Sequence, residues 1–323
     1  MSITLQSGAA VPRHDLRSHY VQFEQDINRL VCDKVAPPRP VEKPDGVYWY
    51  QPREITLALR ECRRASNGGY QFTNLALKSD TFFTTERGES ILLDDRFLSI
   101  FRDVYDAQMA AARITMMNRL RWREWAVAQL IETSTNFPIG TRGHTTSAAW
   151  STAASGDARK DVDTAKVGVW NNSGVQPNAI CMSWKKALEV GRQTSIRGVL
   201  NSTSREIQPT QLSEAQLAEI FQVPYIFLAD APYNTVSEDQ TAVIDSIWPV
   251  DNVFVFRYDP SNDPMMPNVF RTMHYNEDGS SGPLPIVEEY RNEDKRGSII
   301  RARDEWEIKK QDLNLGWVID TTP

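Results

Sequence analysis

The strongest hydrophobic pattern in the chain runs through residues 92–133. Its apolar side chains recur at steps of three and four positions, which places them on one side of a helix. They are Leu93, Phe97, Phe101, Val104, Ala111, Ile114 and Met117. The middle of the segment is rich in alanine and lacks proline and glycine, so helix propensity agrees with the pattern. We expect one helix over 92–133, about 60 Å long at the usual rise per residue; two helices with a break at 115–118 are the alternative.

The flanking residues fit the same interpretation. Residues 87–90, Arg-Gly-Glu-Ser, have the composition of a turn, and Asp94 and Asp95 can accept the free N–H groups of a first helical turn. Residues 134–140 contain Ser, Asn, Pro and Gly, which end helices. We therefore expect the helix to begin directly after residue 91.

A different pattern precedes the helix. Residues 47–50 form an aromatic run, residues 70–77 and 81–85 alternate or are β-branched, and Asn67-Gly68-Gly69 has turn chemistry. This predicts a two-stranded hairpin with a loose tip within residues 46–91. An isolated hairpin is marginal in water, so another chain must cover it if its own chain does not.

Residues 1–45 are typical of an extended arm. Tyr20, Phe23, Ile27 and Leu30 have helical spacing within an amphipathic stretch over 16–31. Prolines then crowd residues 37–44, which predicts an extended linker. We expect this arm to dock on a neighbouring molecule; the alternative is that it folds back on its own chain.

From about residue 137 the pattern changes to short helices interleaved with short strands, so the predicted fold class is α+β. Helices are expected over 158–170, 184–190 and 214–221, the last two capped by Ser183 and Ser213. Strands are expected over 179–182, 225–228, 253–256, 286–290, 298–308 and 317–320. No internal repeat is present.

Composition is that of a globular protein, with 323 residues of which 41% are hydrophobic and 24% charged. No apolar run approaches the length of a membrane span, and residues 1–7 do not resemble a secretory signal. The net charge is −6, and its sign changes along the chain: positions 1–200 are net positive and positions 201–323 strongly negative. Such asymmetry could orient copies head to tail, although scattered solvated charges explain it equally well.

The residues give little sign of catalysis. No nucleotide-binding loop, nucleophile elbow, HExxH or EF-hand string occurs. His14 and His19 are five positions apart on the arm, which is a weak metal pattern. Cys32, Cys62 and Cys181 are far apart and odd in number, which favours free thiols. We assign no catalytic, cofactor-binding or metal-binding residue and expect no cofactor.

An ordered series of short motifs runs through the second half of the chain. The turn Gly174-Val175-Gln176-Pro177-Asn178 precedes a strand, residues 211–223 form a helix, and Ala231-Pro232-Tyr233-Asn234-Thr235 follows the next strand. Ile247-Trp248, residues 289–296 and residues 315–319 continue the series. In this order the motifs resemble the major capsid proteins of tailed bacteriophages over nearly the whole chain, and their order is more specific than any one of them.

The resemblance implies the Johnson fold, with an N-terminal arm, an extended E-loop hairpin, a long spine helix, and peripheral and axial domains. The expected division is 1–45 arm, 46–91 E-loop, 92–170 peripheral domain with the spine helix at 92–133, 171–285 mainly axial domain, and 286–323 strands returning to the peripheral domain. Aromatic side chains are enriched at the cores of interfaces. The candidates for contact between subunits are therefore Tyr48, Trp49 and Tyr50 on the hairpin and Tyr20 and Phe23 on the arm.

The function implied is that of a structural subunit, not an enzyme, which self-assembles into an icosahedral shell around double-stranded viral DNA. The implied partners are copies of the chain in hexamers and pentamers, a portal protein, DNA bound without sequence preference, and possible separate scaffolding and decoration proteins, with no membrane partner. The implied location is the virion capsid, assembled in the host cytoplasm. The alternatives are the shell of a microbial encapsulating compartment and a hydrolase with an unrecognised site.

Overall fold

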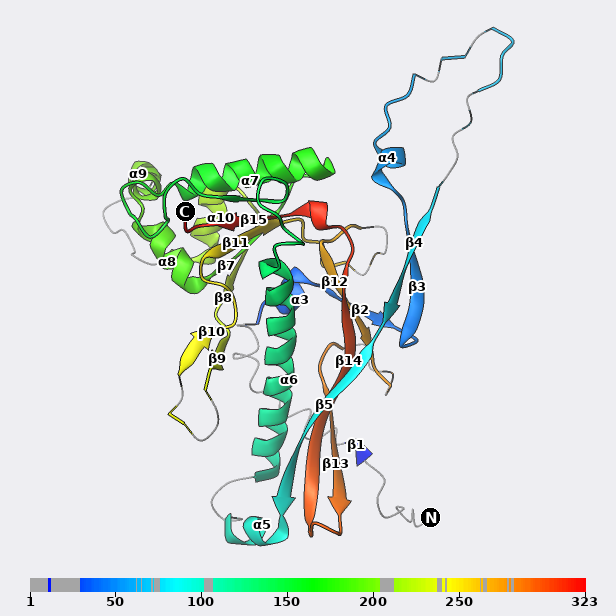
Figure 1. Ribbon diagram of the computed structural model, residues 1–323, viewed down its shortest axis with the longest axis vertical. Coiled ribbons are helices and arrows are strands. Elements are labelled where there is room, and N and C mark those ends of the chain that lie inside the picture. The colour runs from blue at the N-terminus through cyan, green and yellow to red at the C-terminus, as the bar shows by residue number, and fades with distance from the viewer. Residues whose placement is uncertain are drawn as a thin grey trace.

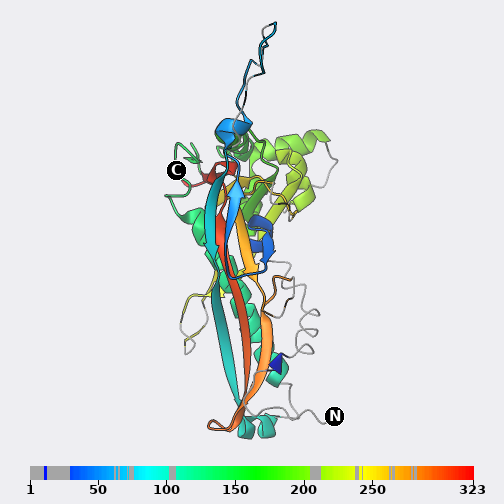
Figure 2. The same ribbon diagram turned by 90° about the vertical axis from the view of Figure 1, so that its right-hand side faces the viewer.

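The computed structural model describes residues 11–12 and 30–323, apart from 62, 65, 71, 73–75, 102–106, 204–211, 237–239, 242, 262, 264–265, 278 and 280–281. These residues have the predicted mixed α+β class. The molecule is elongated: the long helix α6 runs beside a long sheet, and a second, smaller sheet with its own helices lies at one end (Figure 1). Turned by 90°, the molecule is thin, with a loop projecting beyond the second sheet (Figure 2).

The long helix is shorter than the pattern predicts. Helix α6 spans Ala107–Glu132, and α5 (Asp95–Phe101) precedes it. The prediction of helix from residue 92 is wrong, because residues 92–94 complete strand β5 (Thr85–Asp94), which also contains the supposed turn at 87–90. Leu93 fits the apolar spacing of a helix that continues to Phe97, and it also fits an alternating strand with Ile91. Antiparallel pairing of β5 with the distant strand β14 decides between them.

The first sheet is built around β14 (Gly297–Lys310), which pairs antiparallel with β5, β13 (Ile286–Asn292) and β12 (Phe270–Tyr275). β1 (Val11–Pro12) pairs with β13, and β2 (Pro38–Val41) pairs in parallel with β12. The expected linker at the prolines is therefore partly wrong, since β2 belongs to the sheet. Proline lacks an N–H donor, which suits Pro38 and Pro40 to an edge strand.

The second sheet has the order β6-β15-β11-β7-β8. Its strands are β6 (Gly143–Thr145), β7 (Ala179–Ser183), β8 (Tyr225–Ala229), β11 (Asn252–Phe256) and β15 (Gly316–Asp320). We call each sheet together with the helices beside it a body. The helices of the second body are α7 (Ala158–Ser173), α8 (Trp184–Arg192), α9 (Thr194–Thr203) and α10 (Glu214–Phe221). The predicted caps are confirmed: Ser183 accepts from the Lys185 N–H, and Ser213 forms a capping box with Gln216.

Strand β15 does not share a sheet with β13 and β14, the strands expected to accompany it. It pairs with β11 and β6 in the second sheet. Helix α7 packs on β15 so closely that Gly168 leaves no room for a Cβ beside the Trp317 ring. Both contacts join residues far apart in sequence.

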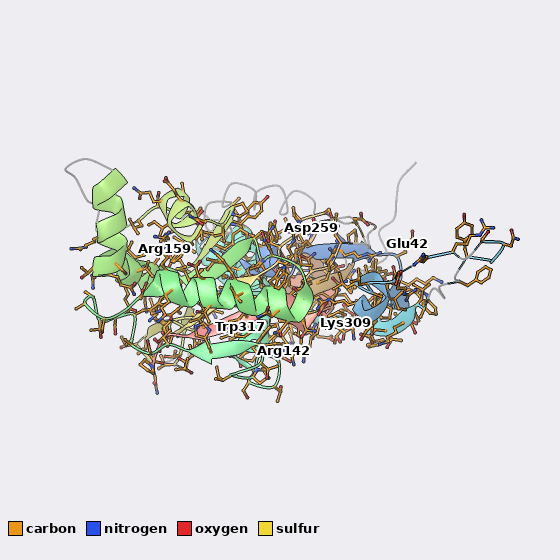
Figure 3. All side chains as sticks on the ribbon, turned by 90° about the horizontal axis from the view of Figure 1, so that it is seen from above. Glu42, Arg142, Arg159, Asp259, Lys309 and Trp317 are labelled. Atoms are coloured by element: carbon orange, nitrogen blue, oxygen red, sulfur yellow. The ribbon has the colours of Figure 1, made fainter. Side chains whose placement is uncertain are left out.

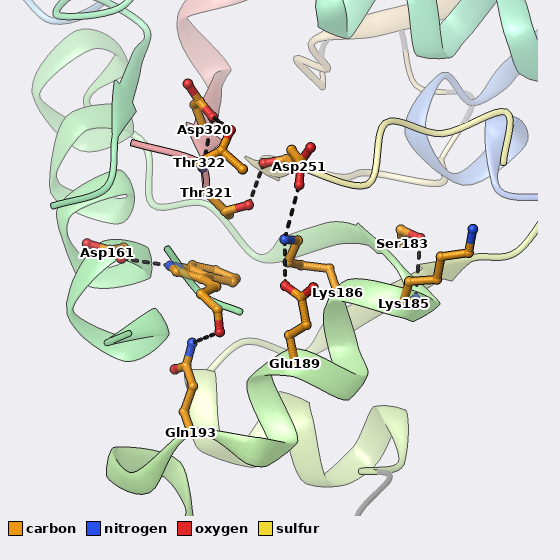
Figure 4. Close-up of polar contacts among 11 residues, drawn as sticks. Asp161, Ser183, Lys185, Lys186, Glu189, Gln193, Asp251, Asp320, Thr321 and Thr322 are labelled. Atoms are coloured by element: carbon orange, nitrogen blue, oxygen red, sulfur yellow. Dashed lines mark hydrogen bonds and ion pairs between the residues drawn. The ribbon is translucent and has the colours of Figure 1, made fainter. Parts of the chain in front are cut away.

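The second body is closed by buried polar contacts as well as apolar ones (Figure 4). The buried Lys186 ammonium donates to Glu189 at 2.6 Å and to Asp251 at 3.4 Å. The Thr321 hydroxyl donates to the Asp251 carbonyl at 2.7 Å. These contacts attach Thr321, directly after β15, to the loop before β11, and attach that loop to α8.

Helix α6 joins the two bodies through charged side chains on its buried face. Glu124 accepts from the backbone N–H groups of Val31 (2.9 Å) and Cys32 (2.8 Å) and from the Trp248 indole. Burial raises the pKa of Glu124, and the three donors oppose that rise. The start of α3 (Cys32–Val35), α6 and the residues after β10 (Ile244–Ser246) thus converge on one carboxylate.

Candidate subunit interface

The most exposed apolar surface lies on one projecting loop, which we define as residues 45–83. It begins with β3 (Asp45–Tyr50) and ends with β4 (Lys78–Phe83), which pair antiparallel. Seen from above, it extends from one end of the molecule, away from α7 (Figure 3). The predicted hairpin is confirmed in these strands. The prediction of strand over 70–77 is not: residues 70, 72, 76 and 77 lie outside any strand.

The three aromatic candidates of β3 point to both faces of the hairpin, because side chains alternate along a strand. Trp49 is 63% exposed. Tyr48 and Tyr50 share the other face, with ring centroids 6.4 Å apart. The Tyr48 hydroxyl donates to Asp80 on β4 at 2.9 Å. The structure thus places Tyr48, Trp49 and Tyr50 together on a projecting element, with Tyr48 partly engaged in holding the hairpin.

The Tyr48–Asp80 bond affects both groups. Burial and the carboxylate raise the pKa of Tyr48. Burial alone would raise the pKa of Asp80, but hydrogen bonds from the Tyr48 hydroxyl and the Thr81 N–H outweigh it and lower that pKa. The bond therefore persists at neutral pH as a neutral phenol donating to an ionised carboxylate.

The hairpin is attached to the first sheet at its base. The Phe83 N–H donates to Glu307 of β14 at 2.7 Å. The Thr84 hydroxyl donates to Glu305 at 2.5 Å and to the Pro44 carbonyl at 3.0 Å. A hollow lies between the hairpin and β14, lined by Val47, Phe83 and Lys309 among others. The base is thus fixed while the faces of the hairpin remain open.

Sequence reasoning missed further apolar residues of the projecting loop. Leu59 and Phe72 are essentially fully exposed, at 102% and 98%. Others with large exposed fractions are Val47, Leu57, Tyr70, Leu77 and Phe83. One feature of the sequence could have identified these residues. Leucine and aromatic residues lie near the predicted turn at 67–69, where a loop that only contacts water would contain polar side chains.

Smaller exposed apolar groups lie elsewhere. Trp122 and Trp125 of α6 stack with centroids 4.9 Å apart and are both exposed. Val167 and Trp170 lie one turn apart on α7. The hairpin of β9 (Pro232–Asn234) and β10 exposes Ile244 and Tyr233. Tyr20 and Phe23, the candidates on the arm, lie outside the described residues, as do His14 and His19.

Groups capable of catalysis are scattered in the described part of the chain. No three His, Cys, Asp or Glu residues within it lie together in a way that could hold a metal ion. Cys32 and Cys181 are free and buried, and burial raises the pKa of both thiols. No helix among these residues is long and apolar enough to cross a bilayer.

Comparison with solved structures identifies the architecture. No family model matches the sequence, and no curated protein matches it. A phage-related protein from Bordetella bronchiseptica RB50 has a TM-score of 0.68 and 19% identity, over 97% of this chain and 98% of that one. The capsid of Myoviridae phage XM1 gives 0.54 and 9%, over 99% and 94%. The SrpI encapsulin of Synechococcus elongatus PCC 7942 gives 0.53 and 11%, over 99% and 93%.

These matches span almost the full length of both partners, so the chain has the fold of phage capsid and encapsulin shells. The Johnson fold expected from the sequence resemblance is therefore confirmed.

Proposed function

We propose that this chain is the structural subunit of an icosahedral capsid that encloses a double-stranded viral DNA genome. The observation that supports this best is a full-length capsid fold whose projecting loop leaves most of its apolar surface uncovered. A single subunit exposes this surface to water, and contact with sister subunits removes it from water at about 25 cal/mol per Å². Its role is assembly rather than catalytic turnover.

The proposed parts follow the capsid fold. Residues 1–45 act as the arm, and residues 46–91, which include nearly all of the projecting loop, act as the E-loop. α6 with the first sheet is the peripheral domain, and the second sheet with α7 to α10 is the axial domain. Tyr48, Trp49, Tyr50, Tyr20 and Phe23 are proposed contacts with neighbouring subunits. The partners are copies in hexamers and pentamers, a portal protein, non-specifically bound DNA, and separate scaffolding and decoration proteins, in a virion assembled in the host cytoplasm.

Many modest contacts suffice for such a shell. Each subunit touches several neighbours, so weak contacts act together through avidity once the lattice closes. Heterologous contacts between an outstretched element of one copy and the body of the next generate rings and closed shells.

A second candidate, a microbial compartment that encloses a protein cargo, is favoured by the fold shared with an encapsulin. The two functions differ in what the shell contains. Shells isolated from the native host should hold double-stranded DNA if this chain is a capsid subunit. A shell containing one enzyme species and no DNA would favour the compartment.

The proposal is tested by expressing the full chain, alone and with the products of its neighbouring genes, and examining it by size-exclusion chromatography and electron microscopy from low to high salt. Closed shells or capsomers are expected. A chain that remains monomeric in every condition, including with its scaffold, would overturn the proposal.

A further inference from the structure

The projecting loop has a second attachment point, in addition to its base at β14. Directly after β3 the chain forms a single-turn helix, α4 (Arg53–Thr56), with Pro52 at its N-cap. A helix of four residues is not stable by itself, and none of its residues is buried. Its position must therefore come from contacts with other elements.

Arg53 supplies those contacts. Its Nη1 donates to the Asn172 carbonyl at 3.0 Å, and its Nη2 donates to the Asp312 carboxylate. Asn172 lies in the last turn of α7, where carbonyls lack partners within the helix and the helix dipole favours a cation. One guanidinium thus joins a helix end and a carboxylate, and its planar fork holds the two donors in a fixed relative orientation.

The residues that receive Arg53 are held independently. The other oxygen of Asp312, Oδ1, accepts from the Asn314 N–H at 3.1 Å and caps the short helix Leu313–Leu315. The Asn172 side chain donates to the Thr141 carbonyl at 2.7 Å. Gly174, which ends α7 with a φ of +71°, leaves room for Leu57: an added Cβ would lie 3.0 Å from Leu57 Cδ1. The residues that contact α4 are therefore positioned by contacts of their own.

Beyond Leu57 the loop contacts itself. Arg64 Nε donates to the Gly68 carbonyl at 2.5 Å, and its guanidinium lies 5.1 Å from the centre of the Tyr70 ring. Leu59 and Phe72 are fully exposed in the same stretch. We call the part of the loop beyond Leu57 its tip. Following the chain from β3, the contact between α4 and α7 is the last one that orients the tip relative to the rest of the subunit.

We propose that Arg53 is a latch that presets the direction of the projecting loop before subunits meet, so that its apolar tip reaches a neighbour without a costly search of orientations. The benefit of this preset direction for assembly rests on the proposed shell function. The latch itself is a property of the single subunit. A preorganised segment loses less conformational freedom on binding than a mobile one. The attachment is ionic, and both partners are about one quarter exposed, so salt weakens it.

The test measures the tip in unassembled subunits. Spin labels are placed on cysteines substituted for Leu59 and Val167, both exposed, in a background with Cys62→Ser. We expect a narrow distance distribution in the otherwise native chain and one about twofold broader in Arg53→Gln, with Arg53→Lys between them because lysine keeps the charge but replaces the planar fork of fixed donors by a single ammonium group. Arg64→Gln is the matched control, since it removes the same charge from a residue whose contacts, among the described residues, are with Gly68 and Tyr70 of the loop itself.

The second measurement varies the salt concentration. A higher salt concentration should broaden the distribution of spin-label distances in the native chain and leave the distribution in Arg53→Gln unchanged. Equal distributions in the native chain and Arg53→Gln would overturn the latch, as would equal broadening in Arg64→Gln.

Measuring shell assembly distinguishes failure of the latch from failure of the proposed function. If the native chain forms shells, Arg53→Gln should form them several-fold more slowly at an unchanged urea midpoint. An unchanged assembly rate with a mobile tip would overturn the positioning role alone. Failure of the native chain to form shells would overturn the proposed function. The spin-label result would remain valid, because it is measured on unassembled subunits.

Discussion

Two antiparallel strand pairs of this chain both contain aromatic residues and have opposite surroundings. β7 and β11 form the middle of the second sheet, and almost every side chain in them is buried. β3 and β4 contain aromatic residues as well, yet their side chains are mostly exposed. Phe254 is 2% exposed and Trp49 is 63% exposed. The difference lies in what covers each pair: the first has further strands and helices of its own chain, and the second has open faces.

The comparison shows that some aromatic residues stabilise the folded subunit and others can stabilise a complex between subunits. The aromatic rings of β11 stabilise the subunit directly, since they leave water when the chain folds. A large aromatic ring buries roughly 150–250 Å², so covering the rings of the hairpin stabilises whatever complex covers them. The presence of aromatic residues alone does not distinguish the two pairs; the elements that cover them do.

The largest effect on subunit stability is expected in the closed sheet. Phe254 packs against Phe137, Phe256 and Phe270, with ring centroids 4.8–6.2 Å apart. Phe254→Ala should lower the free energy of unfolding by about 3–5 kcal/mol, through lost transfer energy and a cavity. Urea unfolding of the unassembled subunit measures this loss. A loss below about 1 kcal/mol would mean that this sheet is no better packed than the hairpin.

The next largest effect is a pH dependence in the first sheet. His274 of β12 is buried, and burial, with repulsion from Arg123 of α6, lowers its pKa to about 4 despite Asp304 of β14 and Asp33 of α3. The unfolded chain binds this proton at about pH 6.5. The contribution to stability is therefore complete above pH 6.5 and is lost as pH falls towards 4, by roughly 3 kcal/mol in total.

The measurement is urea unfolding from pH 7 to 4.5 for the native chain and for His274→Gln. The difference between the two in free energy should shrink as pH falls. A difference that stays constant with pH would contradict the expected linkage.

A smaller effect is expected within the hairpin. Tyr48→Phe removes the hydroxyl that donates to Asp80, which should destabilise the hairpin by about 1 kcal/mol. Hydrogen exchange at β3 and β4 should rise about fivefold, while the urea midpoint of the subunit stays unchanged. Tyr50→Phe is the matched control on the same face. A shift of the global midpoint would show that the hairpin is part of the closed core after all.

The smallest effect on the subunit should accompany a large effect on assembly. Trp49→Ala should change the free energy of unfolding by less than about 0.5 kcal/mol, as exposed substitutions usually do. Shell yield should fall at least about tenfold, because large aromatic residues supply much of an interface's energy. Val167→Ala, an exposed site on α7, should leave the yield unchanged. Normal shells from Trp49→Ala would remove this residue from the proposed interface.

Much of the fold was predictable from local signals. Ser213 marked the start of α10 and Ser183 marked the start of α8. The helix expected over 158–170 extends to Ser173, directly before the turn predicted at Gly174. The strands expected over 47–50, 253–256 and 286–290 correspond to β3, β11 and β13 within a few positions. These features depend on residues a few positions apart, so a single sequence reveals them.

The errors arose where a distant partner decides. Residues 92–94 are strand because β14 pairs with them, and Pro38 and Pro40 are strand because the edge of β12 is open to them. Of the candidate interface, the sequence indicated the aromatic run at 48–50. It did not reveal Leu59 and Phe72, whose significance is their exposure, or Arg53, whose partners are more than a hundred residues away.

Wherever caps, turns and periodicity agree, the amino-acid order was enough to assign helix or strand, and the order of the motifs indicated the capsid fold. Three features required the folded chain: which strands share a sheet, where the long helix begins, and which apolar side chains remain uncovered. Propensity and capping act over a few residues, whereas burial and sheet pairing depend on which distant segment occupies the space beside a side chain.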